Sequence, residues 1–384
     1  MAAFRCGDSS AMQWHIFCRV IDNFGDIGVC WRLAVQLQKD HGQEVSLWVD
    51  DLAAFQQIEP EVLGATEVQT VQGIRVFHWT AQTSGLEAGS PADVVIEAFA
   101  CELPAPLALA LQERNPPPHW INLEYLSAEP WVTDFHLGQS PVGRLTKVFF
   151  FPGFTAGTGG LLAPPAGTES LVAEMATATA RAEFLNSCGI HAAEGERYIS
   201  LFSYETAALN GLLDALVQEQ GWHLLVPQGR AMAGVNRWCG DDLPAVGTRT
   251  RGGLRLSSLP FLSQPEYDRL LAMCELNAVR GEESFIRAQM LGTPLLWHIY
   301  PQEDNAHVIK LNAWLDLLLA ECPQPLAAEL RSAHFCWNDM PESRPADWSY
   351  LLSELPQWRD HLRKWQTVIR RHGDLVTNLM TYCK

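Results

Sequence analysis

Short runs of apolar residues alternate with segments of helical spacing through the first part of the chain. Residues 15–21 and 44–49 are rich in aromatic and β-branched side chains, as in buried strands. Residues 28–39 instead have apolar positions three or four apart, as in a packed helix. Further short apolar runs, each bounded by Pro, Gly or polar residues, lie at 92–96, 120–123 and 146–151. Strands that alternate with helical segments predict a parallel, doubly wound sheet.

The alternation begins again after 161–168, a turn-rich segment that suits a linker. We expect strands at 197–204 and 222–226 with a helix at 206–218 between them, because the apolar spacing changes from strand-like to helical and back. The remaining expected elements are a helix at 265–274, a strand at 276–279, a helix at 282–291 and a strand at 294–300. Two α/β units in tandem predict an α/β fold with two Rossmann-like domains facing a cleft.

The chain of 384 residues is longer than one core usually supports, which agrees with two domains. We place the N-terminal domain at 1–165 and the C-terminal domain at 185–355. The tail at 358–384 is amphipathic and carries several Lys and Arg residues. A helix lying on a membrane surface has this pattern, but we expect a helix that packs back on the first domain.

The overall charge and the cysteines narrow the classes of function. The net charge is −17, from 27 Lys and Arg against 44 Asp and Glu, and this disfavours nucleic acid as a partner because phosphate binding needs a basic face. None of the 10 cysteines forms a Cys-x-x-Cys pair, which disfavours a zinc ribbon. Neither a signal-peptide pattern nor an apolar run of about 18–20 residues occurs. We therefore expect a cytoplasmic protein with no membrane partner.

The turn after the first predicted strand carries two carboxylates, Asp22 and Asp26, beside Gly25 and Gly28. A Rossmann-type domain usually places its glycine-rich phosphate loop here. An anionic loop repels a pyrophosphate, so this turn is better suited to holding a cation or removing a proton. Two structural alternatives stay open, because Asp26 could cap the following helix and Asp22 could hydrogen-bond within the turn.

The segment at 278–289 is a second candidate for a functional site, because a predicted strand end, Gly281 and a predicted helix start follow one another. Unpaired backbone N–H groups and the helix dipole at such a start make an anion site. Ser284 could add a hydroxyl group, and Arg280 and Arg287 could add positive charge.

Two acids in the same segment, Glu282 and Glu283, fit poorly beside a phosphate. They could turn toward sugar hydroxyls or a guanidinium, or they could be favoured in a first helical turn by the dipole alone. Aromatic residues that could stack on a base, or simply pack in a core, lie in the same predicted domain: Phe202, Tyr204, Phe261 and Tyr267. The chain has no Asp-x-Asp, His-Glu-x-x-His or lysine-bearing phosphate loop, so we expect no metal and no cofactor.

Five runs, in order along nearly the whole chain, resemble the bacterial protein-arginine rhamnosyltransferases that modify elongation factor P, the EarP family. The resemblance implies a glycosyltransferase-B fold with the acceptor side in the first domain and the TDP-sugar site in the second. It implies an inverting transfer of rhamnose from TDP-β-L-rhamnose to an arginine of elongation factor P, which helps ribosomes through polyproline. The runs are VIDNFGDIGVCWRLA (20–34), WINLEYLSAEPWV (120–132), FFFPGFTAGTGGLL (149–162), LPFLSQPEYDRLL (259–271) and RGEESFIRAQMLGTPLLWHIYPQ (280–302).

The resemblance also implies roles for particular residues. Asp22 and Asp26 match the two essential aspartates of the family, with Asp26 as the general base, and Glu282 matches its essential glutamate. The family usually has Asp where this chain has Glu283, which keeps the charge but moves it by one methylene. With the anion site included, the residues expected to bind TDP-rhamnose are Phe202, Tyr204, Phe261, Gln264, Tyr267, Arg280, Gly281, Glu283 and Ser284.

An arginine acceptor gives the acidic turn a chemical purpose. A guanidinium stays protonated, with a pKa above about 12, and is a poor nucleophile. A carboxylate can grip it, aim one nitrogen and accept a proton as the new bond forms. We expect Asp26 to take the proton and Asp22 to orient the acceptor or shape the loop. Charge on the leaving TDP would be met by helix N–H groups, Ser284 and arginines.

Three other interpretations stay open. The chain could be a glycosyltransferase with another donor or acceptor, or a non-catalytic module that binds a nucleotide sugar or a translation factor. A two-carboxylate glycosidase is disfavoured, because its acids flank one bond in a single site. Here Asp26 and Glu282 lie about 250 positions apart in the sequence.

Overall fold

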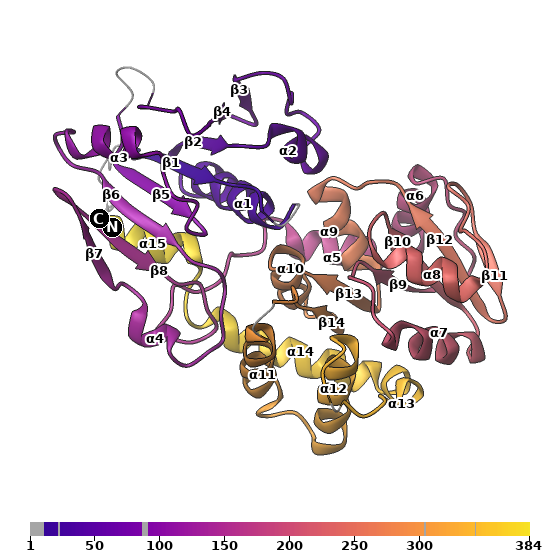
Figure 1. The fold of residues 1–384 in the computed structure, drawn as a ribbon. Helices are drawn as coiled ribbons and strands as arrows, with labels where there is room; N and C mark the ends of the chain where they lie inside the picture. The colour runs from indigo at the N-terminus through magenta and orange to yellow at the C-terminus, as the bar shows by residue number, and fades with distance from the viewer. Residues whose placement is uncertain (1–10, 22–23, 87–90, 303–304, 342) are drawn as a thin grey trace, which may run out of the picture. The chain divides into compact units, whose positions relative to one another are not determined.

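The computed structural model describes residues 11–21, 24–86, 91–302, 305–341 and 343–384 (Figure 1). Its contacts divide the chain into two compact units, each built from more than one segment of the chain. Unit 1 comprises Met1–Tyr125, Asp134–Pro152 and Leu375–Lys384, and unit 2 comprises Leu126–Thr133 and Gly153–Asp374. Each unit contains one sheet with helices packed against it, as the predicted α/β fold requires.

Unit 1 contains an eight-stranded sheet in the order β3-β4-β2-β1-β5-β6-β8-β7. All neighbouring strands pair in parallel except the two edge hairpins, β3–β4 and β7–β8. The inner strands are almost completely buried, as expected for a parallel sheet covered on both faces. The strands are β1 (Gln13–Cys18), β2 (Glu44–Val49), β3 (Val68–Val71), β4 (Ile74–His78), β5 (Val94–Ala98), β6 (His119–Leu123), β7 (Gln139–Val142) and β8 (Leu145–Phe150).

The helices of unit 1 follow its strands, and the longest, α1, packs against β1 and β2 and also contacts the C-terminal helix α15. Trp79 lies in a hydrophobic core of this unit, and its indole N–H donates to the Cys18 carbonyl over 2.9 Å. The helices are α1 (Gly25–Lys39), α2 (Leu52–Ile58), α3 (Ala105–Gln112), α4 (Val132–Phe135), which lies where the two units meet in the sequence, and α15 (Leu375–Cys383).

Unit 2 contains a six-stranded sheet in the order β11-β12-β10-β9-β13-β14, parallel except for the edge strand β11. The chain enters at the centre on β9, continues to one side through β10 and β12, and returns to the other side through β13 and β14. This reversal places a topological switch point beside β9, where open α/β sheets bind ligands. The strands are β9 (Arg197–Leu201), β10 (Trp222–Pro227), β11 (Arg249–Arg251), β12 (Leu254–Leu259), β13 (Leu276–Arg280) and β14 (Leu295–His298).

Most helices of unit 2 share one large core with its sheet, built around buried tryptophans and leucines, while α5 and α6 contribute to a second cluster with part of α9. Phe285 of α10 stacks on Trp297 of β14, with ring centroids 3.8 Å apart. The helices are α5 (Thr168–Met175), α6 (Ala178–Ser187), α7 (Ala208–Gln218), α8 (Ala231–Cys239), α9 (Gln264–Met273), α10 (Glu283–Leu291), α11 (Ala306–Leu319), α12 (Gln324–Trp337), α13 (Trp348–Ser353) and α14 (Leu355–Arg370).

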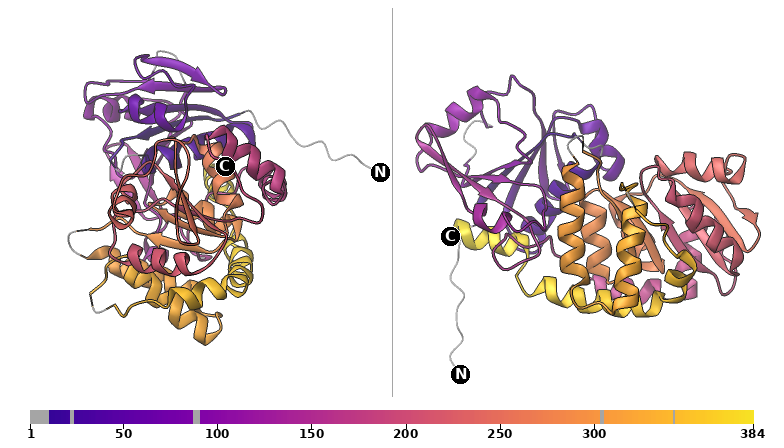
Figure 2. Two further views of the ribbon diagram at one scale, coloured as in Figure 1. Left: turned by 90° about the vertical axis from the view of Figure 1, so that its right-hand side faces the viewer. Right: turned by 60° about the horizontal axis from the view of Figure 1, so that its bottom comes forward.

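The tail at 358–384 is two helices instead of the one expected, as the yellow end of the chain shows (Figure 2). Gly373, with φ of 78°, lies in the break and adopts a left-handed conformation that favours glycine. Only α15 belongs to unit 1. Helix α14 belongs to unit 2, where the Trp365 indole donates to Gln289 of α10 over 2.8 Å.

Candidate functional site

The acidic turn follows β1, the strand that lies between β2 and β5 in the sheet of unit 1. The chain continues on one side of β1 with β2 and returns to the other side with β5, so the turn lies at a topological switch point. Asp26 lies in the first turn of α1 and is buried, with only 3% of its surface exposed. Phe24 occupies the N-cap, and an Asp26 carboxylate oxygen accepts a hydrogen bond from the Ile21 N–H over 3.0 Å. The helix dipole favours the negative charge here. Asp22 lies outside the described residues.

The predicted anion site lies at the corresponding switch point of unit 2, where β13 ends and α10 begins. Gly281 has φ of +65°, a left-handed conformation that turns the chain sharply into the helix. Its carbonyl accepts a hydrogen bond of 2.9 Å from the Trp297 indole. Ser284 is buried and its hydroxyl donates to the Arg280 carbonyl. These contacts order the loop and leave the start of α10 as a source of backbone donors.

Arg280 brings the aromatic residues and the anion site together. Its guanidinium carbon lies 4.4 Å from the ring centroid of Phe202 and 4.9 Å from that of Tyr204, two residues that follow β9. Phe202 also meets Tyr267 of α9 at 5.6 Å between centroids. The Arg280 Nη1 is buried and has no hydrogen-bond partner among the described residues. A buried, cationic donor without a partner suits an anionic ligand.

The start of α9 adds further predicted residues. Ser263 and Glu266 form a capping box that fixes the first turn of α9, where Gln264 begins the helix. The Tyr267 hydroxyl lies one turn further and is buried without a geometrically acceptable hydrogen-bond partner among the described residues. Burial raises the pKa of Tyr267 well above its ordinary value, so it remains a donor at neutral pH. Phe261 is partly exposed just before this helix.

The two glutamates at the start of α10 differ in environment. Glu282 is the N-cap residue of α10 and its carboxylate lies 3.8 Å from the Lys310 ammonium of α11. Glu283 is half-buried, and its charge contributes to the raised pKa of Tyr267. Glu282 therefore turns toward a cation of another helix, while Glu283 lies in electrostatic range of the Tyr267 hydroxyl.

The structure adds residues that the sequence does not predict. His298, at the end of β14, meets the Tyr204 ring edge-on at 5.1 Å, and burial lowers its pKa to about 4. Lys310 reaches Glu282 from α11. Lys310 lies in none of the five runs, and His298 lies in the last of them without being singled out there; strand pairing and helix packing bring the two residues to the site. Arg287 is not free for an anion as expected, since its Nε pairs with Asp268 over 3.2 Å and joins α10 to α9.

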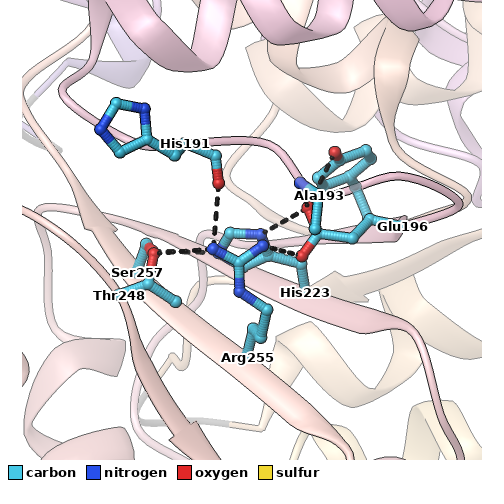
Figure 3. Close-up of polar contacts among 8 residues, drawn as sticks. His191, Ala193, Glu196, His223, Thr248, Arg255 and Ser257 are labelled. Carbon is cyan, nitrogen blue, oxygen red and sulfur yellow. Dashed lines mark hydrogen bonds and ion pairs between the residues drawn. The ribbon is translucent and has the colours of Figure 1, made fainter.

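A second polar cluster in unit 2 has the residue types of a hydrolase triad (Figure 3). The His223 ring nitrogens lie 3.4 Å from a Glu196 carboxylate oxygen and 3.0 Å from the Ser257 hydroxyl. Arg255 also pairs with Glu196. His223 and Ser257 are completely buried, so no substrate can approach that hydroxyl in this conformation. The cluster instead satisfies buried polar groups on neighbouring strands β10 and β12.

Two features are absent from the part of the chain that the structure describes. No group of three or more His, Cys, Asp or Glu side chains is arranged to hold a metal ion among these residues. Within the same residues, no helix is both long and apolar enough to cross a membrane.

The chain is similar to proteins of one family over almost its full length. Residues 14–384 match the model of the family described as "Elongation-Factor P (EF-P) rhamnosyltransferase EarP". A protein-arginine rhamnosyltransferase from Pseudomonas aeruginosa is 46% identical over 96% of this chain and 98% of the relative. One from Shewanella oneidensis is 36% identical over 98% of both chains.

Solved structures agree with these relatives. A structure described as "Structural basis for EarP-mediated arginine glycosylation of translation elongation factor EF-P" matches with a TM-score of 0.67 and 34% identity. That match covers 96% of this chain and 98% of the other. The glycosyltransferase SnogD from Streptomyces nogalater, at a TM-score of 0.50 and 12% identity over 97% and 99% of the two chains, is similar in fold alone.

Proposed function

The chain belongs to the EarP family of elongation factor P rhamnosyltransferases, and from this membership we propose which residues perform the transfer. It has the glycosyltransferase-B fold and is a protein-arginine rhamnosyltransferase that acts on elongation factor P. The donor we propose is TDP-β-L-rhamnose, bound by unit 2. The observation that carries this assignment is Arg280, whose guanidinium lies over two aromatic rings and whose buried Nη1 has no hydrogen-bond partner in the part of the chain that the structure describes.

The donor site combines the two kinds of surface that a nucleoside diphosphate needs. Arg280 and the backbone N–H groups after Gly281, that of Ser284 among them, would meet the charge of the diphosphate, because the Ser284 hydroxyl already donates to the Arg280 carbonyl. Phe202, Tyr204 and Phe261 would provide apolar faces for the base and the sugar. Gln264, the Tyr267 hydroxyl and Glu283 would supply polar contacts. Glu282 would hold a sugar hydroxyl or the loop around the diphosphate, with Lys310 limiting its movement.

The acceptor chemistry is assigned to the acidic turn of unit 1. In the transfer, a nitrogen of the acceptor arginine forms a bond to the anomeric carbon of rhamnose while the bond from that carbon to the diphosphate oxygen breaks. Attack from the opposite side inverts the configuration, and TDP leaves. The departing N–H proton goes to the carboxylate of Asp26. Asp22 orients the guanidinium or shapes the loop.

Stabilisation of the leaving group requires no metal in this proposal. Negative charge that develops on TDP is met by Arg280 and by the start of α10, donors that are already in place before the reaction. We also propose the cytoplasm as the place of action, because an elongation factor works with ribosomes there. The nine described cysteines are free, which agrees with a reducing compartment.

The test combines donor binding with mass spectrometry of the acceptor. Purified protein is incubated with TDP-rhamnose and unmodified elongation factor P in the presence of EDTA. The mass of the acceptor is then measured for the intact protein and for its peptides after digestion. We expect a gain of one deoxyhexose on an arginine-containing peptide. TDP-glucose serves as the matched donor control. Binding of TDP-rhamnose without any transfer would favour a non-catalytic module, and equal transfer from TDP-glucose would contradict the proposed donor.

A further inference from the structure

The loop after β5 in unit 1 has an unusual backbone. Phe99, Ala100 and Glu102 all adopt left-handed conformations, with φ of 55°, 51° and 54°. Residues other than glycine rarely adopt this conformation, because Cβ then approaches the backbone too closely. Three such residues within four positions mark a loop whose shape is imposed by its surroundings. Strain of this kind gathers at ligand sites.

A buried carboxylate holds this loop in place. Glu97, at 2% exposure, accepts a hydrogen bond of 3.0 Å from the Glu102 N–H and one of 3.1 Å from the Trp120 indole. Its second oxygen also lies 2.7 Å from the Lys147 ammonium. The Cys101 thiol adds a contact of 3.5 Å to the Phe17 carbonyl of β1. The loop is therefore tied to β1, β6 and β8 at once.

The strained loop presents an aromatic pair. Phe99 is buried and its ring stacks on that of Tyr125, with centroids 4.5 Å apart and planes inclined by 17°. Tyr125 keeps 38% of its surface exposed. The Phe99 N–H donates to the Leu123 carbonyl over 2.7 Å, which fixes the pair at the carboxyl ends of β5 and β6. A rigid, partly exposed ring is the result.

This ring lies at the same sheet edge as the acidic turn. Strand β5 pairs with both β1 and β6 in parallel, so the loops that carry Asp26, Phe99 and Tyr125 leave neighbouring strand ends. The loop after β5 also contacts β1 directly, because the Cys101 thiol lies 3.5 Å from the Phe17 carbonyl of the strand that leads into the acidic turn. Exposed Glu102 and half-buried Glu124 add acidic groups to this edge.

We propose that the Phe99–Tyr125 pair is the surface on which the acceptor's arginine side chain lies when its guanidinium reaches Asp26. A guanidinium is planar and weakly hydrated, so it stacks on aromatic faces while its edge donates to carboxylates. A compact lysine ammonium lacks the planar face. The pair is thus a positioning element that selects arginine. This inference rests on the proposed function, because it assumes that the acidic turn receives the acceptor.

The experiment measures steady-state transfer for Tyr125→Ala and Tyr125→Phe with the full chain. Acceptor KM and donor KM are determined separately, and TDP binding is measured by calorimetry. Loss of the ring should raise the acceptor KM about tenfold, the effect expected for one cation–π contact of about 1.4 kcal/mol. We expect donor KM and TDP binding to stay unchanged. Tyr125→Phe should remain within about twofold of the wild type, since it keeps the ring face.

Two further variants separate a local effect from a structural one. Leu109→Ala removes an exposed apolar side chain of α3 in the same unit and should leave every parameter unchanged. Phe99→Leu keeps the apolar bulk but removes the stacked ring, so it should raise the acceptor KM with unchanged TDP binding. An unchanged acceptor KM in Tyr125→Ala, with wild-type transfer intact, overturns the inference alone. If the wild type transfers no rhamnose, the proposed function fails and the inference falls with it.

Discussion

The guanidinium carbon of Arg280 lies 4.4 Å from the ring centroid of Phe202. Strand pairing brings them together, since the Phe202 N–H donates to the Ala278 carbonyl of β13 over 2.9 Å. The aromatic face holds the cation in place without neutralising it, as a carboxylate would. The buried Nη1 of Arg280 can then donate to an anion. This arrangement explains how one residue can belong to both the phosphate site and the aromatic cluster.

Replacing Arg280 with Lys should therefore weaken donor binding even though the charge is kept. Lysine cannot stack a planar group on two rings or donate in the same direction. We expect the Kd for TDP, measured by calorimetry, to rise at least about tenfold, with little change in melting temperature. Arg237→Lys, at an exposed arginine of the same unit, is the matched control. Equal TDP affinity in Arg280→Lys and the wild type would contradict the assignment.

Asp26→Asn tests the proposed general base while keeping the shape of the turn. The amide oxygen can still accept the hydrogen bond from the Ile21 N–H, but it cannot take a proton from the acceptor. We expect kcat to fall by about 10²–10⁴, the range for loss of a general base, with unchanged binding of TDP-rhamnose. Asp40→Asn, at the exposed other end of α1, is the control. Near-normal transfer by Asp26→Asn would show that another group takes the proton.

Glu283→Asp introduces the residue that the family resemblance leads us to expect at this position. Glu283 is half-buried near the Tyr267 hydroxyl, where one methylene changes the reach of the carboxylate. If this chain has adjusted its pocket to the longer side chain, the donor KM should rise about three- to tenfold, the effect of losing one hydrogen bond of about 1 kcal/mol. Glu283→Gln keeps the length and shows whether charge matters. A donor KM equal to that of the wild type in both variants would remove Glu283 from the pocket.

The α/β alternation could be predicted because each strand carries its own signal. The strand at Glu44–Val49 has its predicted limits, since polar residues bound an apolar run. The strand expected at 197–204 ends instead at Leu201. Phe202 and Tyr204 have the composition of strand residues, but they leave the sheet and meet Arg280. Aromatic residues favour strands and pockets alike, so sequence periodicity cannot separate the two uses.

Residues that reach the site only through contacts between distant segments could not be predicted from the sequence. The Arg280–Ser284 loop has a local signature, a strand end followed by glycine and a helix start. Lys310 has none, because it reaches Glu282 only through the packing of α11. The strained loop of unit 1 likewise has no sequence pattern that predicts it. Its shape depends on Glu97, a strand residue that accepts a hydrogen bond from the Glu102 N–H and pairs with Lys147 of β8.

A buried histidine predicts how the protein responds to acid. In unit 1 the Trp48 indole donates to Nδ1 of His15 over 3.1 Å, and Nε2 lies 2.9 Å from the Pro91 carbonyl. These contacts require a neutral ring with its proton on Nε2. Protonation of Nδ1 would oppose the tryptophan N–H, and burial lowers the pKa of His15 from 6.5 to about 4.

The sign of the effect follows from the two states of His15. Between pH 6.5 and 4 the unfolded chain binds a proton that the folded chain does not, so stability is full above pH 6.5 and falls as the pH drops toward 4. From pH 7.5 to 5.5 the loss from this residue should be about 1.4 kcal/mol. Urea unfolding at the two pH values measures it, and His15→Gln should show a smaller difference. The exposed His78 supplies a control in His78→Gln, which should keep the wild-type difference. If His15→Gln loses as much stability as the wild type over this range, His15 is not the group that titrates.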